Sequence, residues 1–296
     1  MSITQFYQLA GKPLTLTGIP VELQPTFVAS GRFKMDLEII QRSTQPQGQP
    51  ILFVHGILSA AWIWDVYFLN WFAEQGYQAY ALSLRGHGNS PSDKPINRIG
   101  LADFVEDLRQ AVLQIQTQTG KEPVLVGHSM GGMVVQRYLS EYRAPAAILA
   151  CSVPPQGMMP VSMISTWTNP LLAMKMARIY SQPEQTDLQF TRDVLFYHPV
   201  SDENLQTWFT QTNPESMRLL WDMNVNLPFV SRIKQTPLAV IGARHDRLVP
   251  ASVVHWTAGT YCCPLSWVNA GHAIMLEQNW AETAQCMHEH IQKLLN

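Results

Sequence analysis

The serine of Gly127-His128-Ser129-Met130-Gly131 is the residue of this sequence whose setting best suits a nucleophile. The pattern G-x-S-x-G directly follows the apolar run Val124-Leu125-Val126 and directly precedes a helix-like run from Met130 to Tyr142. At such a strand-to-helix turn, flanking glycines allow a strained backbone that holds the serine hydroxyl clear of the main chain. The motif therefore predicts nucleophilic chemistry at Ser129, against the alternative of a glycine-rich turn with a structural serine.

A serine hydroxyl needs a base to take its proton, and the base needs a carboxylate to orient it. His272 follows the apolar run Leu265 to Val268, and Asp246 follows the run Leu238 to Ile241. Loops at the carboxyl ends of parallel strands meet at one edge of a sheet, so these side chains are expected to converge on Ser129. The catalytic residues predicted are thus Ser129, His272 and Asp246, with other carboxylates as rivals for the last role: Asp93, Glu215 and Asp222.

Methionine and tryptophan accumulate between Val153 and about Ile233, where no pattern of a parallel strand occurs. This segment is expected to be a mainly helical insertion. Its apolar side chains either pack against one another or form an adaptable lid over an apolar ligand. The predicted substrate pocket contains one loop histidine and several residues of the insertion: His55, Met158, Met159, Trp167, Trp208 and Trp221.

The elements that position these residues are read from short apolar runs that alternate with helical patterns. Runs that are apolar on both faces are typical of strands buried in a parallel sheet. They occur at 51–54, 80–84, 124–126, 147–150, 238–241 and 265–268, and the first fifty residues look like antiparallel edge strands. The alternation predicts a doubly wound α/β fold in a single domain, residues 1–296, with a core at 1–152 and 234–296 and a cap at about 153–233.

Five ordered motifs make the chain resemble the α/β-hydrolase superfamily over nearly its whole length, the cap excepted. They are Phe53-Val54-His55-Gly56, Leu84-Arg85-Gly86-His87-Gly88-Asn89-Ser90, Gly127 to Gly132, Gly242…Asp246…Pro250 and Gly271-His272. Within the superfamily the chain looks like the lysophospholipase and monoacylglycerol-lipase-like branch. The resemblance implies a mostly parallel central sheet with helices on both faces, and an oxyanion hole built from the backbone N–H groups of Ile57 and Met130.

The leading hypothesis is a serine hydrolase that cleaves carboxylic esters with an apolar acyl group through an acyl-enzyme on Ser129. The same triad also serves thioester hydrolysis, acyl transfer, carbon–carbon cleavage and cofactor-free peroxidation, and these alternatives stay open. A non-catalytic ligand receptor on a hydrolase scaffold is the hypothesis from another class. A haloalkane dehalogenase or epoxide hydrolase is disfavoured, because both are expected to carry aspartate in place of Ser129.

Composition narrows the classes of partner. Charged residues make up 14% of the chain and the formal net charge is −2, which excludes a disordered chain and argues against nucleic-acid binding. The longest apolar stretch, 145–164, is interrupted by prolines, so no spanning helix is expected. The four cysteines show no C-x-x-C spacing, and neither a disulfide framework, a metal site nor a cofactor is predicted. With no secretory signal visible, the cytoplasm is the expected location, and the oligomeric state is left open.

Overall fold

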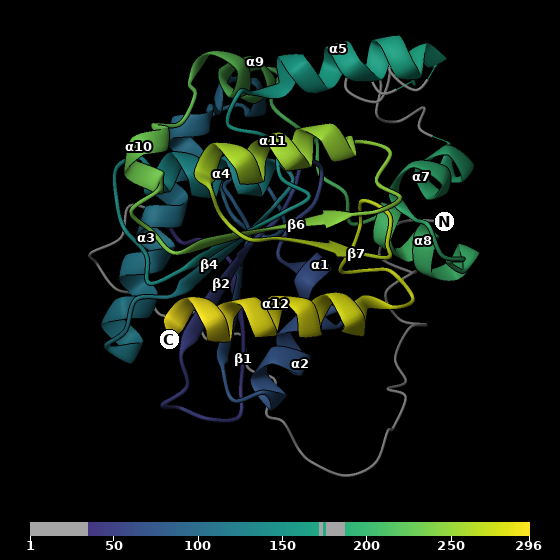
Figure 1. Cartoon of the computed structure of the whole chain (residues 1–296). Helices are drawn as coiled ribbons and strands as arrows, with labels where there is room; N and C mark the ends of the chain where they lie inside the picture. The colour runs from purple at the N-terminus through teal and green to yellow at the C-terminus, as the bar shows by residue number, and fades with distance from the viewer. Residues whose placement is uncertain (1–34, 172–173, 176–186) are drawn as a thin grey trace.

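The computed structural model describes residues 35–171, 174–175 and 187–296. Their centre is a seven-stranded sheet in the order β1-β3-β2-β4-β5-β6-β7, visible edge-on in Figure 1. Every neighbouring pair is parallel except β1 with β3. The strands are β1 (Ile39–Ser43), β2 (Pro50–Val54), β3 (Gln78–Leu82), β4 (Val124–His128), β5 (Ala147–Ala150), β6 (Leu238–Ala243) and β7 (Leu265–Val268).

The apolar runs of the sequence account for this sheet. The strands β2 to β6 are buried along their whole length, as expected for runs that are apolar on both faces, whereas β1 at one edge is half exposed. β3 starts two residues earlier than its apolar run, because the side chain of Gln78 finds partners in the carbonyls of Pro46 and Gly48. The predicted α/β-hydrolase fold is confirmed; β1 is one antiparallel edge strand, and residues 1–34 lie outside the described residues.

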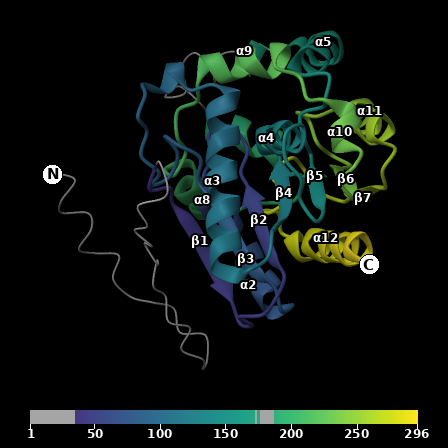
Figure 2. The same ribbon diagram turned by 90° about the vertical axis from the view of Figure 1, so that its left-hand side faces the viewer.

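Helices cover both faces of the sheet, as Figure 2 shows. One apolar cluster joins the sheet to α3, α4 and α11, and a second joins it to α1, α2 and α12. The side chains of α3 that repeat every three or four residues face the sheet, which is why the predicted helix forms there. The bounds are α1 (Trp62–Asp65), α2 (Phe68–Glu74), α3 (Leu101–Thr119), α4 (Met130–Leu139), α11 (Ala251–Tyr261) and α12 (Trp280–Leu295).

In the part of the chain between β5 and β6 that the structure describes, the regular elements are all helices, and we call residues 153–233 the β5–β6 segment. Its helices are α5 (Met158–Thr168), α7 (Leu188–Leu195), α8 (Asp202–Phe209), α9 (Met217–Val225) and α10 (Val230–Ile233). In both views α5 and α9 run together along one outer side of the molecule (Figures 1 and 2). Among the described helices, none is both long enough and apolar enough to cross a membrane.

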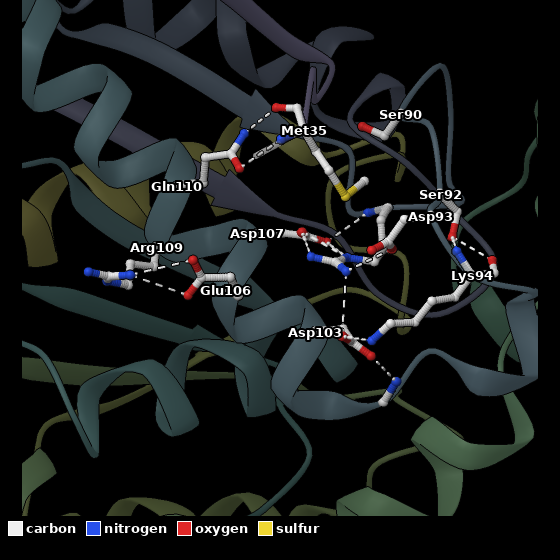
Figure 3. Close-up of polar contacts among 12 residues, drawn as sticks. Met35, Ser90, Ser92, Asp93, Lys94, Asp103, Glu106, Asp107, Arg109 and Gln110 are labelled. Carbon is white, nitrogen blue, oxygen red and sulfur yellow. Dashed lines mark hydrogen bonds and ion pairs between the residues drawn. The ribbon is translucent and has the colours of Figure 1, made fainter. Parts of the chain in front are cut away.

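A buried ion-pair cluster holds the loop that follows β3 (Figure 3). The guanidinium of Arg85 donates to both carboxylate oxygens of Asp107 on α3, with Nη2 to Oδ1 at 2.6 Å. The same guanidinium lies 3.4 Å from Asp103, whose other oxygen accepts from the Gly100 N–H and so caps α3. Leu84 of this loop donates its backbone N–H to His55, whose carbonyl lies against Gly131 in the turn of Ser129. The ion-pair cluster is thereby connected to that turn.

Candidate active site

Ser129 lies at a sharp turn between β4 and α4. Its φ of 53° and ψ of −118° are strained for a residue with a side chain, and the strain is held by close packing of the glycines around it. A Cβ on Gly127 would lie 2.5 Å from the carbonyl oxygen of Gly131, and one on Gly131 would lie 2.4 Å from that of His55. Both positions therefore require glycine, and they allow α4 to start directly against the sheet.

His272 and Asp246 meet beside this turn. The Nδ1 atom of His272 lies 2.8 Å from Oδ2 of Asp246, while Oδ1 of Asp246 accepts the backbone N–H groups of Leu248 and Val249 at 2.8 and 2.9 Å. Burial of Asp246 opposes its ionisation, but His272 and the two N–H groups outweigh burial and lower the pKa of the carboxyl. An ionised Asp246 fixes the proton of His272 on Nδ1, so that Nε2 is left to act as a base.

The rival carboxylates have other partners. Asp222 accepts the N–H of Leu101 at the start of α3, and Asp93 pairs with Arg85. Glu215 accepts the N–H of Ser216 and faces His87 at 3.4 Å. Of the four carboxylates weighed from the sequence, Asp246 is the one that the fold brings to His272.

The two predicted oxyanion donors flank Ser129. Met130 is the first residue of α4, and Ile57 lies in the loop that follows β2. Neither backbone N–H donates a hydrogen bond to another described residue. Next to Ile57, Leu58 has a φ of 61°, and the β5–β6 segment holds both of its backbone groups: Leu58 N–H donates to Glu215, and its carbonyl accepts from Asn213 N–H.

Two buried histidines, His55 and His128, hold backbone groups of the loops around Ser129 through hydrogen bonds. Nδ1–H of His55 donates to the carbonyl of Gly56 and its Nε2 accepts from Leu84, so His55 does not line the pocket as expected. Nε2–H of His128 donates to the carbonyl of His272 at 2.9 Å. Burial, aided by neighbouring histidines, lowers the pKa of each imidazole to about 3, so both are neutral at pH 7.

Sequence reasoning missed Glu277, the buried carboxylate that anchors the His272 loop. It accepts the backbone N–H of Gly271 at 2.7 Å, that of Tyr197 at 2.6 Å, and both the backbone N–H and Nδ1 of His198 at 3.1 Å. The loop of His272 and the chain that follows α7 are thereby joined through one carboxylate. The only signal in the sequence is an acidic residue directly after the apolar stretch 273–276, which does not indicate its partners.

Cys151 is a free, buried cysteine close to His128, His272 and Asp246. Burial and the nearby charge of Asp246 raise the pKa of its thiol well above the usual value. One donor atom each from His128, Cys151 and His272 lie within 4.8 Å of one another, the spacing of a potential metal site. A metal ion there would have to compete with the hydrogen bond that His128 makes to the His272 loop and with the protonated thiol.

A cavity of about 390 Å³ opens above Ser129 and His272, and its wall is almost entirely apolar. Its far side is formed by α7 and α8, including Phe190, Val194, Leu195, Leu205, Trp208 and Phe209. Trp208 lies where the sequence analysis expected it. The other predicted pocket residues of the β5–β6 segment do not line this cavity: Met158, Met159, Trp167 and Trp221.

The difference follows from the placement of α5 and α9, which carry those four residues. Both helices lie on the outer side of the molecule, away from α7 and α8 (Figure 1). Trp167 and Trp221 are 86% and 68% exposed, while Met158 packs partly buried against the apolar cluster of α3 and α4. Composition identified the apolar segment, but it assigned the pocket to the wrong helices of that segment.

The fold and this arrangement at the sheet edge define an α/β-hydrolase. Residues 51–285 match the alpha/beta hydrolase family, and the chain belongs to that family.

Particular relatives carry several names. The chain is 31% identical over 143 residues to a non-heme chloroperoxidase of Burkholderia pyrrocinia, covering 46% of this chain and 47% of the relative. It is 29% identical over 130 residues to a monoacylglycerol lipase of Mycolicibacterium smegmatis, covering 44% and 45%. These matches thus span about half the length of the curated relatives.

Solved structures share the fold over more of the chain. A putative lipase from Acinetobacter baumannii superposes with a TM-score of 0.70 at 17% identity, covering 92% of this chain and 91% of the other. An esterase from Exiguobacterium antarcticum gives a TM-score of 0.66 at 15% identity, covering 87% and 96%. At these identities the likeness shows the fold.

Proposed function

We propose that the protein is a serine hydrolase that cleaves carboxylic esters with an apolar acyl group. The observation that carries the proposal is the pairing of His272 with Asp246 at 2.8 Å in a cavity that Ser129 also lines. The names of the monoacylglycerol lipase and esterase relatives support the same class of reaction.

In the proposed reaction, Oγ of Ser129 attacks the ester carbonyl while Nε2 of His272 takes the hydroxyl proton. The negative charge that develops on the carbonyl oxygen is stabilised by the N–H groups of Ile57 and Met130. Collapse of this intermediate breaks the bond to the alcohol, which leaves with the proton from His272. Water, deprotonated by His272, then attacks the acyl-enzyme, releasing the acid and restoring Ser129.

The acyl group is expected to lie between α7 and α8, because the wall there offers few hydrogen-bond partners and many apolar contacts. We assign about residues 153–233 to a cap that covers this site and the rest of the chain to a core. The chain would thus act on a small apolar ester, with no cofactor taking part in the steps above.

Labelling with a fluorophosphonate tests the nucleophile directly. The wild-type chain should gain one covalent adduct, mapped by mass spectrometry to the peptide of Ser129, and should turn over p-nitrophenyl esters. The matched control is Ser59→Ala, since Ser59 is another hydroxyl of the same cavity and donates to the carbonyl of Gly56. Labelling that survives in Ser129→Ala, or maps to Ser59, would refute the assignment.

A second candidate is perhydrolysis on the same acyl-enzyme, which the relatives named as a non-heme chloroperoxidase and a non-heme haloperoxidase favour. Hydrogen peroxide would replace water as the attacking group, and the product would be a peracid. Hydrolysis and perhydrolysis can be distinguished because water and peroxide compete for the same acyl-enzyme. If perhydrolysis occurs, adding peroxide to an ester reaction should divert product from acid to peracid. A product that stays entirely acid at high peroxide excludes this candidate and leaves the esterase proposal intact.

A further inference from the structure

Two stripes of exposed apolar side chains cover the outer side of the β5–β6 segment. On α5 they are Met159, Met163 and Trp167, and on α9 they are Met217, Trp221 and Val225. Within each helix these residues are four apart, so they lie on one helical face. We call the six together the outer stripe surface.

The two stripes lie side by side. α5 packs against α9, and both helices run along the same outer side of the molecule in the two views (Figures 1 and 2). Their other faces account for the core contacts: Val161 on α5, and Leu219 and Met223 on α9, are buried. The exposed side chains are therefore not needed to pack these helices, and a contiguous apolar surface of this kind marks an interaction site.

The exposed charges on α5, α9 and the helix that follows, α10, are basic. α5 has no ionisable side chain, and the exposed charged residues of α9 and α10 are Arg218 and Arg232. The acidic residue of α9, Asp222, is buried: it accepts the N–H of Leu101 and lies 3.8 Å from Nε of Arg218, whose side chain is 60% exposed. An apolar face with exposed tryptophan and a basic rim complements a lipid surface that bears negative charge.

A second copy of the chain fits the same surface less well. Two copies related by a twofold axis would place the same surface against itself, so Arg218 and Arg232 of one copy would face apolar side chains or the arginines of the other. No exposed acidic side chain on α5, α9 or α10 is present to pair with them.

We propose that the outer stripe surface binds an anionic phospholipid surface. The tryptophan, methionine and valine side chains enter the headgroup region, and the arginines contact lipid phosphates. This binding goes beyond the proposed ester hydrolysis and does not depend on it, because the surface is separate from the residues that line the cavity. It would hold the chain where apolar esters accumulate.

The test uses the full chain carrying Ser129→Ala, so that lipid is not consumed and binding is measured whether or not the chain is an esterase. Flotation with vesicles of phosphatidylcholine plus phosphatidylglycerol should carry the protein, and added salt should weaken the association. Replacing both Trp167 and Trp221 by serine should reduce binding by about tenfold for each tryptophan. The matched control is Trp256→Ser, a tryptophan that is 48% exposed on α11; it should bind within about twofold of the parent.

A second variant keeps the proposal testable if the double tryptophan variant does not fold. Arg218→Gln should lower binding to phosphatidylglycerol vesicles about fivefold, and should leave weak binding to pure phosphatidylcholine unchanged. Brominated lipid should quench the fluorescence of the parent and of Trp256→Ser more than that of Trp167→Ser.

Several outcomes overturn the proposal. These are a parent chain that does not float with anionic vesicles, equal losses in Trp256→Ser and the double variant, and a self-associated parent that the double variant makes monomeric without any change in vesicle binding. The last outcome would assign the surface to a second copy. A failure of ester turnover in the wild-type chain would count against the proposed function and not against lipid binding.

Discussion

The residues that the sequence analysis singled out are buried at the carboxyl edge of the sheet but largely exposed in the β5–β6 segment. At the sheet edge, Ser129, His272 and the side chain of Asp246 are buried, and Asp246 and the ring of His272 have hydrogen-bond partners. In the β5–β6 segment, the residues that stood out by composition are largely turned to solvent, as Trp167 and Trp221 are. Residue type at a strand end thus indicates a role, whereas residue type on a short helix does not reveal which way a side chain faces.

The two regions are nevertheless joined at two points. Glu215 and Asn213 hold Leu58 beside the proposed oxyanion donor, and Glu277 holds the His272 loop against Tyr197 and His198. The inner side of the β5–β6 segment therefore belongs to the site, and its outer side does not. Substitutions should accordingly matter most at the sheet edge, less on the cavity wall and least for ester turnover on the outer stripe surface.

The largest expected effect is at the triad. Ser129→Ala and His272→Ala should each lower kcat by roughly 10⁵- to 10⁶-fold, because the two residues transfer one proton in one step. The double variant should be scarcely worse than either single variant in p-nitrophenyl ester turnover. Losses that multiply would contradict the pairing, and Ser59→Ala, at the same cavity, should stay within about tenfold of the wild type.

Asp246→Asn should cost ~10⁴-fold in kcat, since an amide at this position favours the wrong tautomer of His272. Thermal unfolding should confirm that the variant is folded. Asp222→Asn serves as the control, because Asp222 bonds the start of α3 and not the histidine. If Asp222→Asn were the inactive variant and Asp246→Asn the active one, the acid would belong to the β5–β6 segment.

The buried histidines should make the fold sensitive to acid. Burial lowers the pKa of His55 and of His128 to about 3, whereas an imidazole in the unfolded chain titrates near 6.5. Between these values the unfolded chain binds two protons that the folded chain does not. The free energy of unfolding that the two neutral histidines contribute is therefore complete above about pH 6.5. It is lost as the pH falls towards 3, with a slope of ~1.4 kcal/mol per pH unit for each histidine.

Urea unfolding at a series of pH values measures this slope. His128→Gln keeps a donor for the carbonyl of His272 and should remove about half of the slope over that range. His255→Gln, at an exposed position of α11, should leave the slope as it is. An unchanged slope in His128→Gln would mean that His128 does not stay neutral in the folded chain.

The cavity wall should produce smaller effects than the sheet edge, measured as a chain-length profile. Each methylene buried between α7 and α8 should raise kcat/KM by up to roughly fourfold, so medium-length acyl esters should be preferred over acetate until the cavity is full. Trp208→Ala should move the plateau to longer chains, and Trp221→Ser should not move it. A flat or falling profile from acetate to octanoate would mean that the wall does not bind the acyl group.

The α/β-hydrolase architecture follows from features that are local in the sequence. The run Val124-Leu125-Val126 followed by Gly-x-Ser-x-Gly predicts a strand, a turn and a helix, and the chain forms these elements there. The order of Ser129, Asp246 and His272 then limits which strand ends converge. The fold and the candidate triad are therefore readable from the chain alone, down to strand ends that differ by about two residues.

Contacts between distant segments were decided only by the tertiary structure. Glu277 finds its donors at Tyr197 and His198, and His55 is taken out of the pocket by Leu84; neither pairing leaves a trace in residue spacing. α5 has no charged side chain and only a weak amphipathic pattern, so its sequence does not show which side faces solvent. Which helices enclose the cavity was set by how α5 and α9 pack on the core, which leaves α7 and α8 to cover Ser129 and His272.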